Sequence, residues 1–471
     1  MARSWAVLGL TLAFGSLACA TYSDKTNAMR EHVQAGQHPQ GLAELNRFIK
    51  VKDPHELPTK WGSETALAVL ERGTLLHAMQ DWDASAINFQ AAEDQLELLD
   101  LAKDTAGEIG KYMFSDSATK YKTTPTEKLS LNAINLLNYL NQGDLDGAQI
   151  EGKRFTVMRN YLLDYDPDSA HGAFGSYLAG FVAEREGNWD EALRFYDEAL
   201  ELRELPGLGP AIQRVAQKGS YRTERLDRYI GSGPTLTPTP SEAEGAGTGA
   251  VPSDAEAIPV PADPAPLAKG AEVLLVVKTG RVPYKVPRRI PIGAAIGLAG
   301  AYITGDTTLL EHSAMKVVVF PDLEPAGNLF DDAAWSIDGV PLHIDLVSDL
   351  GVEITHEFDQ LKPKIIGSAI TRMIVRAAAA EGARAAGNEA NAAVGLISAL
   401  ALEATMVALD KPDTRSWTLL PDRVFIGRTM VPAGEHRVEV LVQGNGGHET
   451  RTMQVNVAEG GYVVLDVTTL R

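Results

Sequence analysis

Two stretches of the chain repeat one pattern of small, aromatic and polar positions. The first runs from Gly73 to Ala92 and the second from Gly180 to Ala199. In each, a glycine on a first helix is followed by a turn, an aromatic residue, and then small, aromatic and small residues on a second helix. The matching positions are Gly73 and Gly180, Trp82 and Trp189, Ser85 and Ala192, Phe89 and Tyr196, and Ala92 and Ala199. The pattern predicts two helical hairpins.

Weaker copies of this pattern turn at Gly36 and Gly143. The four predicted turns fall into two pairs with one spacing, because Gly36 and Gly143 (143 − 36) and Gln80 and Gly187 (187 − 80) are each 107 residues apart. We infer a two-hairpin unit duplicated once, with a longer connection around residues 100–125. The hairpins resemble tetratricopeptide repeats, in which glycine lets neighbouring helices approach closely.

Arrays of such repeats bury a continuous core and present a concave face. We expect Trp82 and Trp189 to fill the wedge between paired helices, inside the stack. We expect Arg72, His77 and Glu184, which lie on first helices between packing positions, to line the concave face and bind a partner. Two alternatives stay open: each copy is a plain amphipathic hairpin, or the array is only a spacer for a working β domain.

Residues 231–270 have the composition of a linker. They hold eight of the 25 prolines and no aromatic residue, so they cannot bury enough apolar area to offset chain ordering. We expect a disordered spacer between two domains that move relative to one another. A proline-rich ligand for a recognition module is the alternative.

Residues 271–471 show strand patterns. Glu272–Lys278 is a nearly continuous apolar run, which predicts a buried strand, and Asp338-Gly339 predicts a hairpin turn. Further strands are predicted at 314–321, 335–341, 432–442, 450–458 and 462–468, the last three antiparallel. They resemble small β-sandwich modules of surface and periplasmic proteins, here with a helical insertion at about 360–410. The predicted fold class is therefore multi-domain α+β.

Two apolar stretches interrupt the predicted strands, Ile290–Gly305 and Asn391–Leu409. The first contains Gly293-x-x-x-Gly297, a spacing that lets membrane helices pack closely, but it is too short to span a bilayer. The two interpretations are membrane insertion or oligomer assembly, and buried helices packed on the β domain. We favour the second, because Glu403 would be costly in the middle of a bilayer.

The first 19 residues have the layout of a lipoprotein signal peptide. Arg3 precedes an apolar stretch, Trp5–Leu17, that is too short for a membrane span, and Cys19 is the only cysteine. The arrangement resembles a bacterial lipobox, in which the thiol accepts lipid such as palmitate, although Ser16 stands where leucine is usual. By resemblance to known lipoprotein sorting rules, a residue other than aspartate after the cysteine, here Ala20, favours the outer membrane. We therefore expect a lipid anchor at Cys19 in that membrane, with the protein facing the periplasm. An ordinary signal peptide cut nearby is the alternative.

The charge and the motif search mainly exclude functions. The chain has 62 acidic and 43 basic side chains, for a net charge of −19, and neither half is basic, so no nucleic-acid partner is expected. No HExxH, CxxC, phosphate-loop, GxSxG or dinucleotide-binding motif occurs, so we expect no cofactor and no enzyme. Two groups of acids beside histidine could in principle hold a metal: His343 with Asp345, and His356 with Glu357 and Asp359. Such groups are common on solvated strand faces, so no metal site is predicted.

Three segments carry a resemblance to a family: residues 142–155, residues 282–285 and above all residues 413–436, which include Asp413, Arg415 and Trp417. They resemble an uncharacterised family of tetratricopeptide-containing bacterial lipoproteins. Its members often occur beside lipoproteins similar to the curli secretion channel, which implies envelope assembly but no reaction. From the residues, Asp413 and Arg415 are expected to lock a helix-to-strand junction.

Two classes of function remain. The first is a lipid-anchored scaffold that binds protein partners in an envelope assembly or secretion complex, either as a single chain or as an oligomer. The second is an enzyme that acts on a cell-wall or surface polymer through the C-terminal β domain. The repeats and the missing catalytic motifs favour the scaffold.

Overall fold

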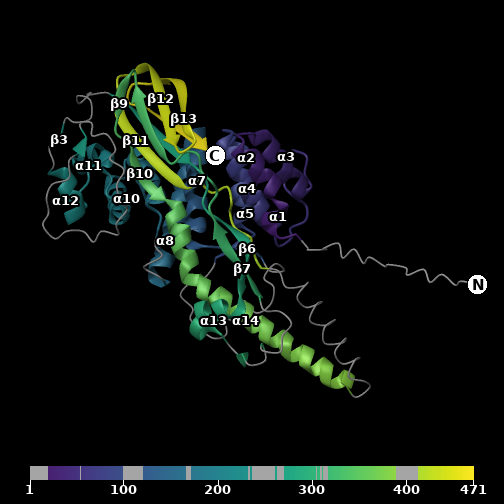
Figure 1. Cartoon of the computed structure of the whole chain (residues 1–471). Helices are drawn as coiled ribbons and strands as arrows, with labels where there is room; N and C mark the ends of the chain where they lie inside the picture. The colour runs from purple at the N-terminus through teal and green to yellow at the C-terminus, as the bar shows by residue number, and fades with distance from the viewer. Residues whose placement is uncertain are drawn as a thin grey trace, which may run out of the picture.

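The computed structural model describes residues 20–53, 55–98, 120–165, 171–231, 234–235, 260–261, 270–303, 305–307, 310, 317–388 and 412–471. The signal peptide with Cys19, most of the linker, the connection after residue 98 and the apolar stretch 391–409 lie outside these residues. The described part has the mixed α+β class, with helices in the N-terminal half and sheets in the C-terminal region (Figure 1).

Helices pair in sequence order through the N-terminal half. The described helices are α1 (Tyr22–Lys25), α2 (Asn27–Gln34), α3 (His38–Ile49), α4 (Thr65–Ala78), α5 (Trp82–Glu93), α7 (Pro125–Gln142), α8 (Leu145–Tyr165), α9 (Ala173–Arg185), α10 (Trp189–Leu202), η3 (Pro206–Leu208), α11 (Gly209–Ala216) and α12 (Glu224–Ile230). We call α2–α5 and α7–α10 the helical array. Two short strands, β1 (Glu97–Leu98) and β2 (Lys122–Thr123), pair beside it.

The turns of the array fall where the sequence spacing predicts them. Gly36, Gln80, Gly143 and Gly187 all have left-handed backbone, with φ of 73°, 66°, 73° and 79°. The close helix contacts are also confirmed, because a Cβ added at Gly180 would lie 2.4 Å from the ring of Tyr196. At Gly73 the corresponding distance to the Phe89 ring is 3.1 Å. The small positions Ser85, Ala92, Ala192 and Ala199 are fully buried.

Contrary to the prediction from the sequence, the two repeat tryptophans do not lie inside the stack. Trp82 and Trp189 are the first residues of α5 and α10, and both are partly exposed. Trp82 packs its ring 4.9 Å from that of His77, and the ammonium of Lys218 lies 4.1 Å from the Trp189 ring. A helix start has no further turn to cover it, so these rings close the ends of the hairpins instead of filling the wedge.

Two four-stranded sheets form a sandwich. The inner sheet has the order β10-β11-β5-β14 and the outer sheet β13-β12-β8-β9. The strands are β5 (Ala271–Thr279), β8 (Asp332–Ile337), β9 (Val340–Leu342), β10 (Asp345–Asp349), β11 (Arg423–Val431), β12 (Gly434–Gly444), β13 (Gly447–Val457) and β14 (Tyr462–Thr469). The predicted hairpin at Asp338-Gly339 is confirmed, because both residues have positive φ, 51° and 80°, and join β8 to β9.

The position of the last strand, β14, differs from the prediction. β12 and β13 form the expected antiparallel hairpin, but β14 crosses to the inner sheet and pairs in parallel with β5. The physical reason is that β14 is apolar on both faces. Val463 and Leu465 pack towards the outer sheet, while Tyr462 and Val464 pack towards the helices.

The inner sheet is the middle of three layers. Along β5, Val273 and Leu275 belong to the core between the sheets, whereas Leu274 and Val276 belong to the core shared with the helical array. The inner sheet thus covers the inner face of the array (Figure 1). The helical and β-rich parts share one core, which contradicts the expectation that they move independently.

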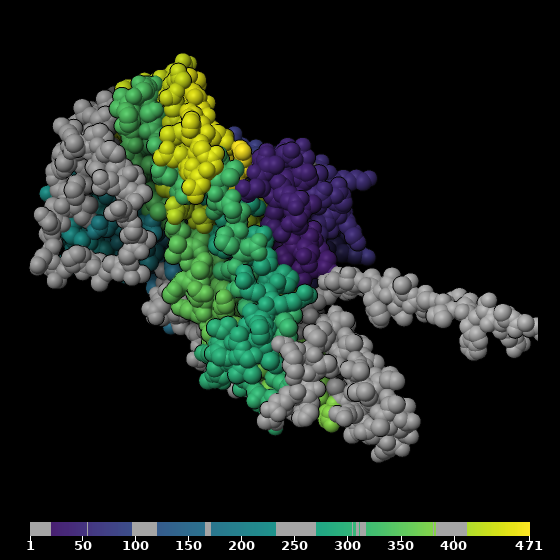
Figure 2. All heavy atoms as spheres, in the orientation of Figure 1, coloured from purple at the N-terminus to yellow at the C-terminus, as the bar shows by residue number. Residues whose placement is uncertain are grey.

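A projection, here called the arm, extends from the body (Figures 1 and 2). It consists of β6 (Tyr284–Pro291), α13 (Ile292–Ala299), η4 (Gly300–Tyr302), β7 (Val317–Glu324) and α14 (Leu350–Asn388). It has a small core of its own around Phe320 and Ile370. Because α14 begins at residue 350, His356, Glu357 and Asp359 lie on a helix and not on alternating strand positions. A last strand pair is β3 (Pro234–Thr235) with β4 (Val260–Pro261).

Candidate functional site

The contact between the helical array and the inner sheet contains the most extensive group of buried charges described here. His77 on α4 and Glu184 on α9 occupy equivalent positions of the two strong repeats, 107 residues apart (184 − 77). Both side chains point from the array to the inner sheet, and each meets a different set of charges there.

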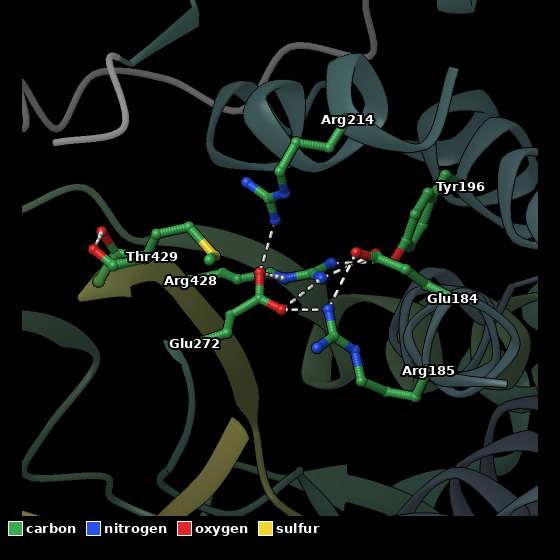
Figure 3. A network of polar contacts seen from close by, with 8 residues as sticks. Glu184, Arg185, Tyr196, Arg214, Glu272, Arg428 and Thr429 are labelled. Atoms are coloured by element: carbon green, nitrogen blue, oxygen red, sulfur yellow. Dashed lines mark hydrogen bonds and ion pairs between the residues drawn. The ribbon is translucent and has the colours of Figure 1, made fainter. Parts of the chain in front are cut away.

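Glu184 enters a network around Arg428 of β11 and Glu272 of β5 (Figure 3). Arg428 donates to Glu184 over 2.7 Å and to the two oxygens of Glu272 over 2.7 and 3.0 Å. Tyr196 also donates to Glu184, over 2.6 Å. Arg214 of α11 donates to Glu272 over 2.6 Å, and Arg185 of α9 contacts the same carboxylate. One strand glutamate is therefore bound by cations from three elements.

Burial and paired charge oppose each other in this network. Burial alone would raise the pKa of Glu272, but Arg428, Arg214 and Arg185 lower it to about 2. Burial would likewise lower the pKa of Arg428, yet Glu184 and Glu272 raise it above its ordinary value. Glu272 and Arg428 are therefore both charged at neutral pH, and the cluster is a structural ion network.

His77 enters a second network at the other end of β5. Its Nε2 lies 3.1 Å from Asp466 of β14, and its Nδ1 lies 2.7 Å from the Asn138 side-chain oxygen. Lys278 of β5 pairs with the same Asp466 carboxylate, to which Thr468 also donates. Burial and Lys278 lower the pKa of His77 in spite of Asp466, so the ring is neutral and donates to one of its two neighbours.

Asp466 is the charged centre of this second network. Burial would raise its pKa, but Lys278 and His77 lower it well below the ordinary range. Burial lowers the pKa of Lys278, and Asp466 opposes that shift. The pair has side-chain exposures of 0% and 1%, so neither charge is solvated and each depends on the other.

A third group of buried contacts joins residues 412–422 to the helical array. Trp417 is fully buried, lies 6.0 Å from the Phe89 ring and donates to Thr74 over 2.8 Å. The backbone N–H groups of Thr418 and Leu419 donate to Glu71 over 2.7 and 2.8 Å. Burial raises the pKa of Glu71 to about 7.

Asp413 and Arg415 precede these contacts and form the pair that the sequence suggested. Arg415 contacts Asp413 over 2.6 and 2.8 Å and also donates to the backbone oxygen of Ser63. The pair therefore ties the segment that leads to β11 to the backbone just before α4.

The residues expected to bind a partner are not on an open face. His77 and Glu184 are 1% and 6% exposed and are bound by the chain's own inner sheet. Arg72 is fully buried between helices, where it donates to Asn88 over 2.7 Å and to the backbone oxygen of Glu56 over 2.8 Å. The expectation of an accessible concave face is wrong for these three residues. The inner sheet covers His77 and Glu184, and the array's own residues Asn88, Asn46 and Glu56 enclose Arg72.

Sequence reasoning missed the residues that bind the two parts together: Glu71, Glu272, Lys278, Arg428 and Asp466. A signal was present, because Glu272 and Lys278 flank an apolar run and Asp466 interrupts one. Charges in strands buried on both faces need partners. The pattern could have predicted a second layer, although not which residues of the array supply the partners.

One helix of the array keeps an exposed apolar row. On α8 the buried side carries Ala148, Phe155 and Leu162, while the opposite side exposes Ile150 at 53%, Val157 at 70% and Tyr161 at 41%. Beside this row lies an open groove of about 560 Å³, here called the α8 groove. It is lined by Glu93, Asp94, Lys128, Asn132, Ile150, Lys153, Arg154, Val157 and Met158.

The root of the arm is fixed to the array by a buried acid. Glu357 of α14 accepts hydrogen bonds of 2.8 Å from both the N–H and the hydroxyl of Thr126, in the first turn of α7. Burial raises the pKa of Glu357 to about 7. A carboxylate at a helix N-terminus is favourable, so this contact orients α14 as it leaves the body.

Within the described ranges, no helix combines the length and the apolar character that crossing a bilayer requires. A scan against protein-family models finds no match to the chain, and a search of curated proteins finds none either. The resemblance to tetratricopeptide lipoproteins stays a prediction.

Proposed function

We propose that the protein is a lipid-anchored scaffold that faces the periplasm from the outer membrane and binds a protein partner of a cell-envelope assembly or secretion complex. The anchor is Cys19, and the partner binds along the α8 groove. The exposed row Ile150, Val157 and Tyr161 is the observation that carries the binding face.

The position of this row supports the proposal. Because the inner sheet occupies the concave face, a partner of the array has to use another surface. Residues 150, 157 and 161 follow helical spacing and form one stripe, and an apolar stripe beside a groove suits the apolar face of a partner helix.

The rim of the α8 groove supplies polarity without a large excess charge. Lys128 contacts Glu93, and Arg154 donates to Glu151 over 2.9 Å. An apolar centre with a paired polar rim is the usual anatomy of a protein–protein interface. The partner is therefore expected to be held mainly by apolar burial.

The test is site-specific photocrosslinking in intact cells, with the crosslinker at position 157. A defined crosslinked species is expected, and Ile150→Asp with Val157→Asp should reduce partner capture about tenfold or more, since each buried aliphatic side chain contributes about 1.5–3 kcal/mol. Val352→Asp is the matched control, because Val352 is 61% exposed on α14. Equal loss in the control, or no crosslink at position 157, would remove the α8 groove as the binding face.

Anchoring has a separate test. Cys19→Ser should make the protein extractable from membranes by a high-salt wash, whereas the wild type should require detergent, because several acyl chains bind far more strongly than a surface contact. If the Cys19→Ser protein also required detergent, the lipid anchor would be the wrong explanation.

A further inference from the structure

The arm carries an exposed apolar helix, α13, which packs along α14 and which the proposed partner groove does not involve. From Ile290 to Gly305 the sequence has no charged side chain. Within α13, Ala295 and Ala299 are buried against α14, while Ile296 is 36% and Leu298 53% exposed. A Cβ placed at Gly293 or Gly297 would meet nothing within 4 Å, so this face is open (Figure 2).

The charge around this face differs from that of the rest of the protein. The chain carries −19 overall, yet Gln360–Ala380 of α14, which backs α13, holds Lys362, Lys364, Arg372 and Arg376 and no acidic residue. This stretch of α14 is therefore basic on an acidic protein, and its charge is complementary to an anionic surface.

Basic residues also border α13 directly. Arg288 and Arg289 precede it on β6 and are exposed, and Asp306 follows it. Asp322 pairs with both Arg288 and Lys362, each at 2.8 Å, so one acid faces two cations. Arg289 extends from an exposed strand position next to the helix start.

We propose that the exposed face of α13 rests on an anionic lipid surface. Ile296 and Leu298 enter the apolar boundary, and Arg288 and Arg289 lie at the level of the phosphate groups. Eight residues of helix are about 12 Å long, which suits a helix lying in the membrane interface and not one that spans it.

The experiment is flotation of the full Cys19→Ser chain, which carries no acyl group, with phosphatidylcholine vesicles that either contain or lack phosphatidylglycerol. Binding is expected with the anionic vesicles and should weaken as salt rises. Ile296→Ser with Leu298→Ser should lower binding about tenfold or more, and Arg288→Gln with Arg289→Gln several-fold, with a smaller salt dependence. Ile150→Ser with Val157→Ser should leave binding unchanged.

Absence of flotation with anionic vesicles would overturn the proposal, as would an equal loss in the Ile150 and Val157 control. If the Ile296 and Leu298 variant lost self-association in sedimentation while keeping its vesicle binding, the face would belong to a second copy of the chain. Both α13 residues are exposed, so unchanged thermal melts are expected for every variant. The crosslinking at position 157 uses another face and a protein partner, so either proposal can fail alone.

Discussion

His77 and Glu184 hold equivalent positions of two copies of one helical hairpin, yet they bind the inner sheet by different chemistry. Glu184 contributes a carboxylate to Arg428, within a network that three arginines stabilise. His77 contributes an imidazole to the buried pair of Lys278 and Asp466. The charges of β5 are reversed between its ends, with an acid at Glu272 and a base at Lys278.

This difference shows what the equivalent hairpin geometry fixes and what it leaves open. It fixes where a side chain of the first helix points, because the turn geometry is the same in both copies. It does not fix the residue type at that position, which can differ between the repeats to suit the charges of the inner sheet. Buried ion pairs add little stability compared with apolar residues, but a mismatched one is costly, so the two networks specify which repeat faces which end of β5.

The largest loss of stability is expected in the network of His77, Lys278 and Asp466, in which fewer charged groups share the burial. Lys278→Met removes the lysine that pairs with Asp466 and leaves the carboxylate with only neutral partners, the imidazole of His77 and the hydroxyl of Thr468. The free energy of unfolding should therefore fall by about 3–5 kcal/mol. Lys278→Met with Asp466→Leu removes both charges and should recover to within about 1 kcal/mol of the wild type. Denaturant unfolding measures both, and a double variant no better than the single one would contradict the pairing argument.

A smaller loss is expected at the network with more partners. Arg428→Met leaves Glu272 bound by Arg214 and Arg185, and Glu184 bound by Tyr196, so we expect a loss of about 2–3 kcal/mol. Arg437→Met, on the same sandwich and with a side chain 58% exposed, should change the free energy of unfolding by less than about 0.5 kcal/mol. If Arg428→Met lowered the free energy of unfolding more than Lys278→Met does, the larger number of partners around Glu272 would not protect that network.

Acid should weaken the two networks in different pH windows. The pKa of His77 is lowered by folding, so below its unfolded value of about 6.5 the unfolded chain binds more protons and stability falls. The pKa of Glu272 is lowered to about 2, so its contribution is present above about 4.3 and is lost between there and about 2.

The pH comparison is measured by urea unfolding from pH 7 to 5. His77→Gln should reduce the acid-induced loss by up to about 1.4 kcal/mol per pH unit, whereas Arg428→Met should leave the slope in this range as in the wild type. The buried acids Glu71 and Glu357 titrate in all three proteins, so their opposite contribution cancels. Identical slopes for His77→Gln and the wild type would show that the imidazole does not titrate on unfolding.

The smallest expected effect concerns the equivalent turns. Gln80 and Gly187 both have left-handed backbone, and only the glutamine is strained there. Gln80→Gly should raise the free energy of unfolding by about 0.5–1 kcal/mol, and Gly187→Ala should lower it by about 1 kcal/mol. Thermal melts compare the two, and destabilisation by Gln80→Gly would mean that its side-chain contact to the Asp466 backbone oxygen, 3.4 Å long, outweighs the strain.

The periodic parts of the fold could be predicted from the sequence. The turns at Gly36, Gly143 and Gly187 follow from glycines at a fixed spacing, and Gln80 follows from the alignment alone. The strand at Glu272–Lys278 follows from its apolar run. These features depend on neighbours in sequence, so the chain itself contains the necessary information.

Pairings across long sequence distances could not be predicted in this way. The sequence of β14 suits pairing with β13 as well as pairing with β5. The choice of β5 depends on the helical array, which covers the second apolar face of the strand. His77 and Glu184 looked like surface residues of an open groove because nothing local shows that Asp466 and Arg428 cover them. The apolar row of α8 was equally invisible, because Ile150 and Val157 suit a buried helix as well as an exposed one.

The position of β14 has a consequence for how the protein reaches its native state. His77 and Asp466 are separated by 389 residues, and Phe181 packs its ring 5.4 Å from that of Tyr462. The helix pairs form from local contacts, but their inner side is completed only when a strand from far along the chain arrives, which makes this step slow. Until that strand arrives the early helices present uncovered apolar surface, and this interval is when the molecule is most exposed to aggregation.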